Sequence, residues 1–162
     1  NVITIGAFAF SSSLLSGELN LPNVTTIGSK AFANSKISGK VTANSLTTLS
    51  DDVFSRTKIS EVEMNEMESL GESSFSSLQT LKKATFNKLK TITNGQHLSF
   101  VGTYGAFYGS GIDDFTAPKL EFIGTYAFGN LHKVDKVLLK VPDNVQIAQN
   151  AFDSKEKYQI AG

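Results

Sequence analysis

A six-residue stretch ending in phenylalanine recurs along the whole chain, and this repetition restricts the fold more than any other feature of the sequence. The second copy, Ile27-Gly28-Ser29-Lys30-Ala31-Phe32, serves as the template. Equivalent phenylalanines follow one another at intervals of 22, 22, 21, 32, 21 and 24 residues: Phe10, Phe32, Phe54, Phe75, Phe107, Phe128 and Phe152. A period near 22 with a fixed apolar template is typical of a solenoid, in which similar coils stack on one another.

Each repeat also contains two apolar residues separated by one residue, the alternation typical of a short strand with one buried face. The pairs are Leu19/Leu21, Val41/Ala43, Val62/Met64, Ala84/Phe86, Phe115/Ala117 and Val137/Leu139. We expect successive strands to lie side by side and parallel. The phenylalanines should lie on the opposite wall, in a turn or short helix, and stack into one hydrophobic spine. A glycine that follows Ile, Leu or Val predicts a sharp turn with positive φ, at Gly6, Gly28, Gly71, Gly102 and Gly124.

The pattern L-x-x-V-x-L-(P)-x-x-L-x-x-I-G-x-x-A-F resembles the BspA-like leucine-rich repeat of bacterial and protozoan surface proteins. Residues 19–32, LNLPNVTTIGSKAF, match it best. The resemblance implies an α/β fold, a right-handed horseshoe with a parallel sheet of short strands on the concave face and turns or short helices on the convex face. It also implies an extracellular or cell-surface location and a role in adhesion or host-protein binding. It supplies no binding-site motif.

Domain organisation follows from the same repeats. Residues 1–162 read as one solenoid domain of about six to seven repeats. The chain opens in mid-pattern, because residues 1–5 align with residues 23–27, so we expect a fragment of a longer solenoid. The first and last repeats, with Val2–Ile5 and Tyr158–Ile160, lack the polar outer face of capping repeats. Further chain or end-to-end contacts between copies should cover them.

Composition excludes several classes of function. Fifteen basic and fifteen acidic residues cancel, whereas nucleic-acid-binding proteins carry a basic excess. The chain has no apolar run near the roughly 20 residues of a membrane-spanning helix. It contains no cysteine, which rules out disulfides and thiolate metal sites. We therefore expect no nucleic-acid partner, no spanning segment, no cofactor and no metal.

Polar residues of alternating charge precede the strands. Glu18, Lys40, Glu61, Lys83, Asp114 and Lys136 would form a ladder of opposite charges across parallel strands. The ladder can serve as a mixed-charge recognition stripe, but the small contribution of surface ion pairs favours a role in register and solubility. Asn44, Asn65 and Asn87 predict a second ladder, of side-chain hydrogen bonds between coils.

One irregular segment is the best candidate for a binding site. The interval between Phe75 and Phe107 exceeds the period by about ten residues, and the surplus falls at Thr93–Phe100. Insertions in solenoids project as loops and often carry specificity. The candidate ligand-binding residues are His97, Phe100, Tyr104 and Tyr108. The alternative is a tolerated loop with no role, because lengthening a surface loop costs little.

The sequence carries no recognisable catalytic motif. The two histidines, His97 and His132, occupy non-equivalent positions, and HExxH, Walker-type and GxSxG sequences are absent. We therefore expect no enzyme, but a cell-surface or secreted binding module that recognises a protein or glycan through the concave sheet and the 93–104 loop. The alternatives are a structural spacer of a larger surface protein and an enzyme with an unrecognised site.

Overall fold

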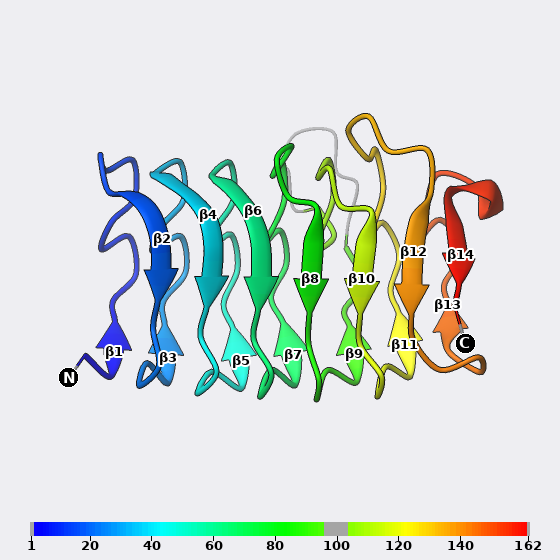
Figure 1. Ribbon diagram of the computed structural model, residues 1–162, viewed down its shortest axis with the longest axis horizontal. Helices are drawn as coiled ribbons and strands as arrows, with labels where there is room; N and C mark the ends of the chain where they lie inside the picture. Colours follow the sequence, from blue (N-terminus) through cyan, green and yellow to red (C-terminus); the bar gives the residue numbers. More distant parts are fainter. Residues whose placement is uncertain (1, 96–103, 162) are drawn as a thin grey trace.

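The computed structural model describes residues 2–95 and 104–161, which form a stack of coils built from short parallel strands (Figure 1). One strand per coil contributes to the larger sheet: β2 (Ser16–Asn20), β4 (Lys36–Thr42), β6 (Lys58–Glu63), β8 (Lys83–Thr85), β10 (Asp114–Thr116), β12 (Val137–Lys140) and β14 (Tyr158–Ile160). A second, two-residue strand per coil lies behind it: β1 (Thr4–Ile5), β3 (Thr26–Ile27), β5 (Thr48–Leu49), β7 (Ser69–Leu70), β9 (Thr91–Ile92), β11 (Phe122–Ile123) and β13 (Gln146–Ile147). We number the coils 1 to 7 by their spine phenylalanines, from Phe10 to Phe152.

The larger sheet is parallel throughout, and its strands follow one another in sequence order from β2 to β14. Val41 pairs with Leu19 and Val62, and Ala84 pairs with Val62 and Phe115. The predicted parallel arrangement and most of the predicted register are thus confirmed.

The register expected for the last repeats is wrong by two residues. Phe115 lies opposite Leu139 rather than Val137, and Asp114 lies opposite Leu138. Val137, Leu139 and Val141 are all buried and alternate along the chain. Since side chains alternate between the two faces of a strand, a shift of two residues leaves the same face buried, and the apolar pattern cannot distinguish the two registers.

The spine phenylalanines stack as predicted. Neighbouring rings from Phe10 to Phe152 are nearly parallel, with centroids 4.8–5.8 Å apart and interplanar angles of 2–10°. The rings from Phe32 to Phe152 are buried and belong to one continuous core with the inward residues of both sheets. This core places the polar residues of every coil on the outside.

The phenylalanines lie on a wall made of turns. We call the segment between the short strand and the longer strand of each coil the turn wall; in coil 2 it comprises residues 28–35. The part of the chain that the structure describes contains no α-helix, and its one helical element is the 3-10 helix Lys155–Lys157. The turns of the predicted convex face are therefore present, whereas its short helices are not found; curvature and handedness stay predictions.

The recurring glycine of the turns has a different structural role from the one predicted. Gly6, Gly28, Gly71 and Gly124 do not have positive φ, and Gly102 lies outside the described residues. A Cβ at Gly28 would lie 2.8 Å from the Cα of Ala7, and one at Gly71 would lie 2.5 Å from the carbonyl carbon of Ser50. At these two glycines the backbones of adjacent coils approach too closely for a side chain.

Backbone hydrogen bonds around most spine phenylalanines run toward the next coil, whereas the residue that opens the turn donates to the preceding coil, as Gly28 does to Ile5 at 2.9 Å. In coil 2 the N–H groups of Lys30, Phe32 and Asn34 donate to carbonyls of coil 3, at 3.1, 3.0 and 2.9 Å. Each end of the stack therefore has unpaired groups. Among the described residues no donor reaches the carbonyls of Ala7, Ala9 and Ser11 in coil 1, and no acceptor reaches the N–H groups of Asn150 and Phe152 in coil 7.

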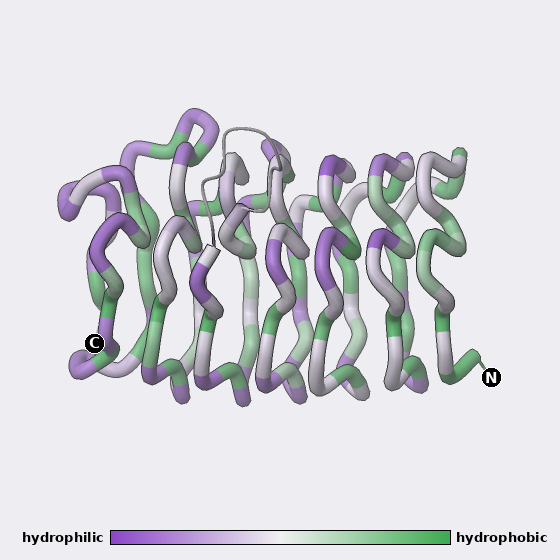
Figure 2. Tube along the Cα trace, turned by 180° about the vertical axis from the view of Figure 1, so that it is seen from behind, coloured by the Kyte–Doolittle hydropathy of each residue, from purple (hydrophilic) through white to green (hydrophobic). Residues whose placement is uncertain are grey.

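The first coil also exposes apolar side chains, as the sequence predicted for an uncapped end. The hydrophobic colour of the trace at the N-terminal end marks this coil in Figure 2. They are Val2, Ile3, Phe8, Phe10, Leu14 and Leu15. At the other end Tyr158 and Ile160 are half-buried, because they pack against the core from the edge of the larger sheet. Contacts between copies through these ends stay a prediction.

Candidate functional site

The predicted site residues fall into two groups. Tyr104 and Tyr108 stack with ring centroids 4.2 Å apart and an interplanar angle of 10°. Tyr108 also covers Gly129 of the next coil, where a Cβ would lie 3.0 Å from the Tyr108 ring. Burial raises the pKa of the Tyr108 phenol above its usual value. His97 and Phe100 lie outside the described residues.

The loop expected at Thr93–Phe100 begins later than predicted. Gly95 donates its N–H to the Thr125 carbonyl at 2.8 Å, and the Asn94 side chain accepts from the Thr125 N–H at 2.9 Å. The Thr93 hydroxyl donates to the Leu70 carbonyl. Thr93, Asn94 and Gly95 therefore belong to the stack and not to an inserted loop.

On the outer face of the larger sheet, several charged side chains pair with one another. Lys40 contacts Glu61 at 3.3 Å and Glu63 at 2.6 Å, and Lys83 contacts Glu61 at 3.8 Å. Hydrogen bonding to Lys40 lowers the pKa of Glu63. These pairs confirm the Lys40–Glu61 and Glu61–Lys83 steps of the predicted charge ladder, whereas the described residues contain no ion pair for the Glu18–Lys40 and Lys83–Asp114 steps.

The last step of the predicted charge ladder is wrong. The shift by two places Asp114 opposite Leu138, its ion-pair partner is Lys140, two residues further along, at 2.7 Å, and Lys136 precedes strand β12. The asparagine ladder is confirmed: the Asn65 N–H donates to the Asn44 side chain at 2.9 Å, and the Asn87 amide donates to Asn65 at 2.8 Å.

Two columns of side chains run along the turn wall, because most turns hold two residues in the left-handed conformation four positions apart. In coil 2 these residues are Lys30 and Asn34, with φ of 58° and 57°. The first column comprises Phe8, Lys30, Asp52, Ser73, Tyr126 and Asn150, and the second comprises Ser12, Asn34, Arg56, Ser77, Gly109 and Asn130. The left-handed conformation costs a non-glycine residue roughly 1–2 kcal/mol, which the hydrogen bonds between coils offset.

A groove of about 210 Å³ lies between these columns in coils 1 to 5. Its deep side is formed by small residues, of which Ala33, Ser55 and Ser76 are buried. We call it the turn-wall groove, lined by Ser11, Lys30, Ala33, Asn34, Asp52, Ser55, Arg56, Ser76, Ser77 and Tyr104. Of the two predicted site residues that the structure describes, Tyr104 lines the groove, at its coil 5 end, and Tyr108 does not.

Unlike the sheet face, the turn-wall groove holds charges without ion-pair partners. In residues 2–95 and 104–161 no carboxylate lies within 4 Å of the Lys30 amine or the Arg56 guanidinium. Burial raises the pKa of the Asp52 carboxyl, while Lys30 opposes that effect from a distance. The groove therefore presents cationic and anionic groups that a ligand can pair.

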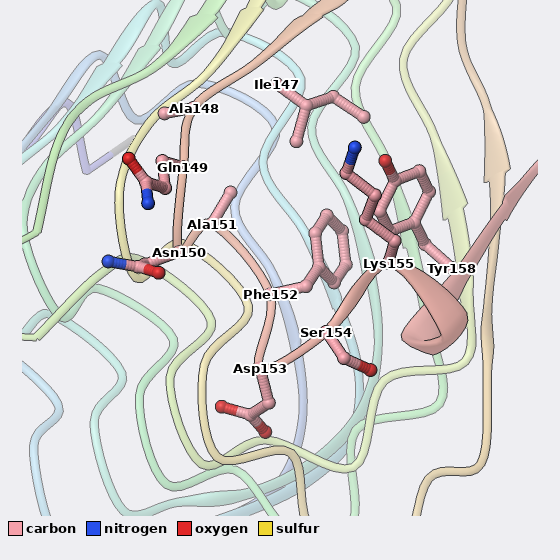
Figure 3. Close-up of a pocket in the computed structure, with 10 residues that line it drawn as sticks. All are labelled: Ile147, Ala148, Gln149, Asn150, Ala151, Phe152, Asp153, Ser154, Lys155 and Tyr158. Carbon is pink, nitrogen blue, oxygen red and sulfur yellow. The ribbon is translucent and has the colours of Figure 1, made fainter.

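A second cavity, of about 500 Å³, lies at the C-terminal end of the stack (Figure 3). Phe152 packs against Tyr158 at 4.6 Å, and Lys155 lies beside that ring (Figure 3). The unpaired N–H groups of Asn150 and Phe152 belong to this end. The inner coils use the equivalent N–H groups to bond to the next coil. This cavity therefore presents the hydrogen-bonding groups of any uncovered coil.

Metal and membrane sites were sought in the same described residues. They contain no group of three or more His, Asp or Glu side chains positioned to hold a metal ion. None of their helices is long and apolar enough to span a bilayer.

Comparison with known proteins identifies the repeat. A family profile described as BspA type leucine rich repeat region matches six copies, over residues 1–102 and 100–160. No curated protein and no solved structure gave a significant match.

Proposed function

Since the chain belongs to the BspA-type leucine-rich repeat family, we propose that it is a non-catalytic binding module of a cell-surface or secreted protein. Its partner is a protein or a glycan, which it recognises through the turn-wall groove and the adjoining Tyr104–Tyr108 pair. The family resemblance supports the location and the role in adhesion. The place of the site is argued from the structure.

The observation that carries the proposal is the contrast between the two outer faces. On the sheet face Lys40, Lys83 and Lys140 already have carboxylate partners. A ligand there would have to replace these pairs, and truncating or displacing one partner of an ion pair costs energy. Among the described residues Arg56 has no such partner in the groove, so a ligand can bind it without replacing an ion pair. We therefore favour the groove over the concave sheet.

The proposal is tested with variants that remove groove side chains and preserve the backbone. Asn34 and Arg56 have positive φ, which glycine adopts without strain. The double variant N34G/R56G should keep its melting temperature and lose binding to partners found on an array of glycans and extracellular proteins. The matched control is S12G/N150G, which changes left-handed residues outside the groove and should bind as the wild type does.

Two results would contradict this assignment. Partners that bind N34G/R56G as tightly as the wild type place the site elsewhere, and loss of binding in K40S/K140S would then move it to the sheet face. The continuous phenylalanine stack supports the alternative of a rigid structural spacer. Absence of any partner for the wild-type chain would favour that alternative.

A further inference from the structure

We propose that the turn-wall groove binds an acidic saccharide, with one carboxylate-bearing pyranose residue seated in the groove. This inference rests on the proposed function of the same site and names its ligand class. It is argued from the charges, the hydrogen-bonding groups and the size of the groove.

The cations of the groove require an anionic group. Arg56 and Lys30 line the groove from different columns and coils. The Arg56 guanidinium has no hydrogen-bond partner among the described residues, and Lys30 lies 6.0 Å from the Phe8 ring centroid. A planar guanidinium binds a carboxylate through two parallel hydrogen bonds. A carboxylate on the ligand would therefore lie at Arg56, with Lys30 adding charge attraction.

The carboxylate of Asp52 argues against a ligand that is only an anion. It lines the same groove as the two cations and is half-buried. A phosphate ion would be repelled by it, whereas a sugar hydroxyl would donate a hydrogen bond to it. A ligand with both a carboxylate and hydroxyl groups satisfies Arg56 and Asp52 together.

The remaining lining groups and the size of the groove fit one sugar ring. Ser55, Ser76 and Ser77 bring hydroxyls that donate and accept, and the Asn34 amide does both. The volume of about 210 Å³ is below the roughly 300–1,000 Å³ of sites for drug-sized ligands. Tyr104 forms the end of the groove and offers an apolar ring beside the polar groups.

The inference is tested by titrating the chain with four probes and following backbone amides by nuclear magnetic resonance. The probes are methyl β-glucuronoside, its neutral counterpart methyl β-glucoside, inorganic phosphate and N-acetylglutamate amide. The glucuronoside should shift the amides of residues 33–34, 55–56 and 76–77 saturably. The glucoside should bind at least roughly tenfold more weakly, since it lacks a charge-assisted contact of about 1.5–3 kcal/mol.

Two variants test the contacts of the ligand's carboxylate and of its hydroxyl groups separately. R56G should weaken glucuronoside binding by roughly tenfold or more. D52N keeps a residue suited to positive φ; it should weaken the glucuronoside while strengthening phosphate, because the repulsive charge is gone. The control N150G, which changes a left-handed residue outside the groove, should bind all probes as the wild type does.

The inference is overturned if no glucuronoside shift is seen, if the glucoside binds equally well, or if phosphate or N-acetylglutamate amide binds as tightly. These failures are separable from failure of the proposed function. A neutral glycan or a peptide whose binding is lost in N34G/R56G would leave the groove as the binding site and show that acidic saccharides are the wrong class.

Discussion

Truncating Phe54 tests the central structural claim, that the stacked phenylalanines hold the coils together. Its side chain is 0% exposed, and its ring stacks on Phe32 at 5.3 Å and on Phe75 at 5.8 Å. F54A removes the ring from the middle of the spine and breaks both stacked contacts. The turn-wall hydrogen bonds from Phe32 to Val53 and from Phe54 to Ser74, at 3.0 and 2.9 Å, keep the coils apart.

The expected loss of free energy of unfolding follows from the spacing of the coils, which these hydrogen bonds hold fixed. Phe-to-Ala substitutions in cores cost about 3–5 kcal/mol, and the cost rises with the cavity that remains. Each stacked aromatic pair adds about 0.5–1.5 kcal/mol beyond its area burial. Because the backbone ladder prevents the cavity from closing, F54A should lie near the upper end, at about 5 kcal/mol.

The measurement is the free energy of unfolding from urea titration, with F10A as the matched control. Phe10 belongs to the same column, but it is 39% exposed and stacks on Phe32 only. F10A should cost about 1–2 kcal/mol. Equal costs for the two variants, or a cost below about 2 kcal/mol for F54A, would refute the stacked spine as the source of stability.

Three further predictions concern the contacts between coils. G28A should lower the free energy of unfolding by about 1–3 kcal/mol, because the new Cβ meets the backbone of Ala7; G6A, with nothing within 4 Å of its Cβ, should cost less, and equal thermal denaturation midpoints would contradict the close-approach argument. N65A should cost about 1–2 kcal/mol through loss of its side-chain hydrogen bonds, measured by urea unfolding; an unchanged midpoint would show that the ladder adds no stability. Glu63 has a pKa lowered from 4.5 by its hydrogen bond to Lys40, so its contribution is present above pH 4.5 and is lost as pH falls through the lowered value. E63Q should therefore show a smaller loss of stability in that acid range, and superimposable pH profiles would disprove the coupling.

The stacking of the coils could be predicted from the sequence because each coil repeats the same apolar pattern. The spacing of Phe32, Phe54 and Phe75 determines the period, and the apolar alternation in each repeat identifies the strand. The sequence could not decide between turns and short helices for the residues around each phenylalanine. The left-handed residues of the turns end any helical run after a few positions, and nothing in the apolar pattern records them.

Two predicted details of the fold were wrong, because the sequence shows which residue occupies a position but not which atoms surround it. Glycine at Gly28 and Gly71 fits both a positive φ and a close approach of backbones, and only the neighbouring coil decides between them. The register shift of two residues at Asp114 could not be predicted, because the apolar pattern has a period of two and fits both registers. One sequence alone therefore cannot decide between positive φ and close approach at a glycine, or between the two strand registers.

The candidate site was found only in part. Tyr104 and Tyr108 were predicted from the irregular interval, and the structure brings them together. The groove beside them was missed, because its residues come from five coils, and no single repeat marks them as a site. A signal was available: Ser, Asn or Gly stands two residues after most spine phenylalanines, as Asn34 and Asn130 do. Such residues favour the left-handed conformation that forms the second column.

The direction of the hydrogen bonds around the spine phenylalanines has a consequence for how such a stack can grow. In the part of the chain that the structure describes, one end offers the carbonyls of Ala7, Ala9 and Ser11, and the other offers the N–H groups of Asn150 and Phe152. These two sets complement one another only when two copies follow each other in the same orientation. A head-to-tail contact would therefore continue this ladder, whereas a contact between like ends would leave its carbonyls or its N–H groups without partners.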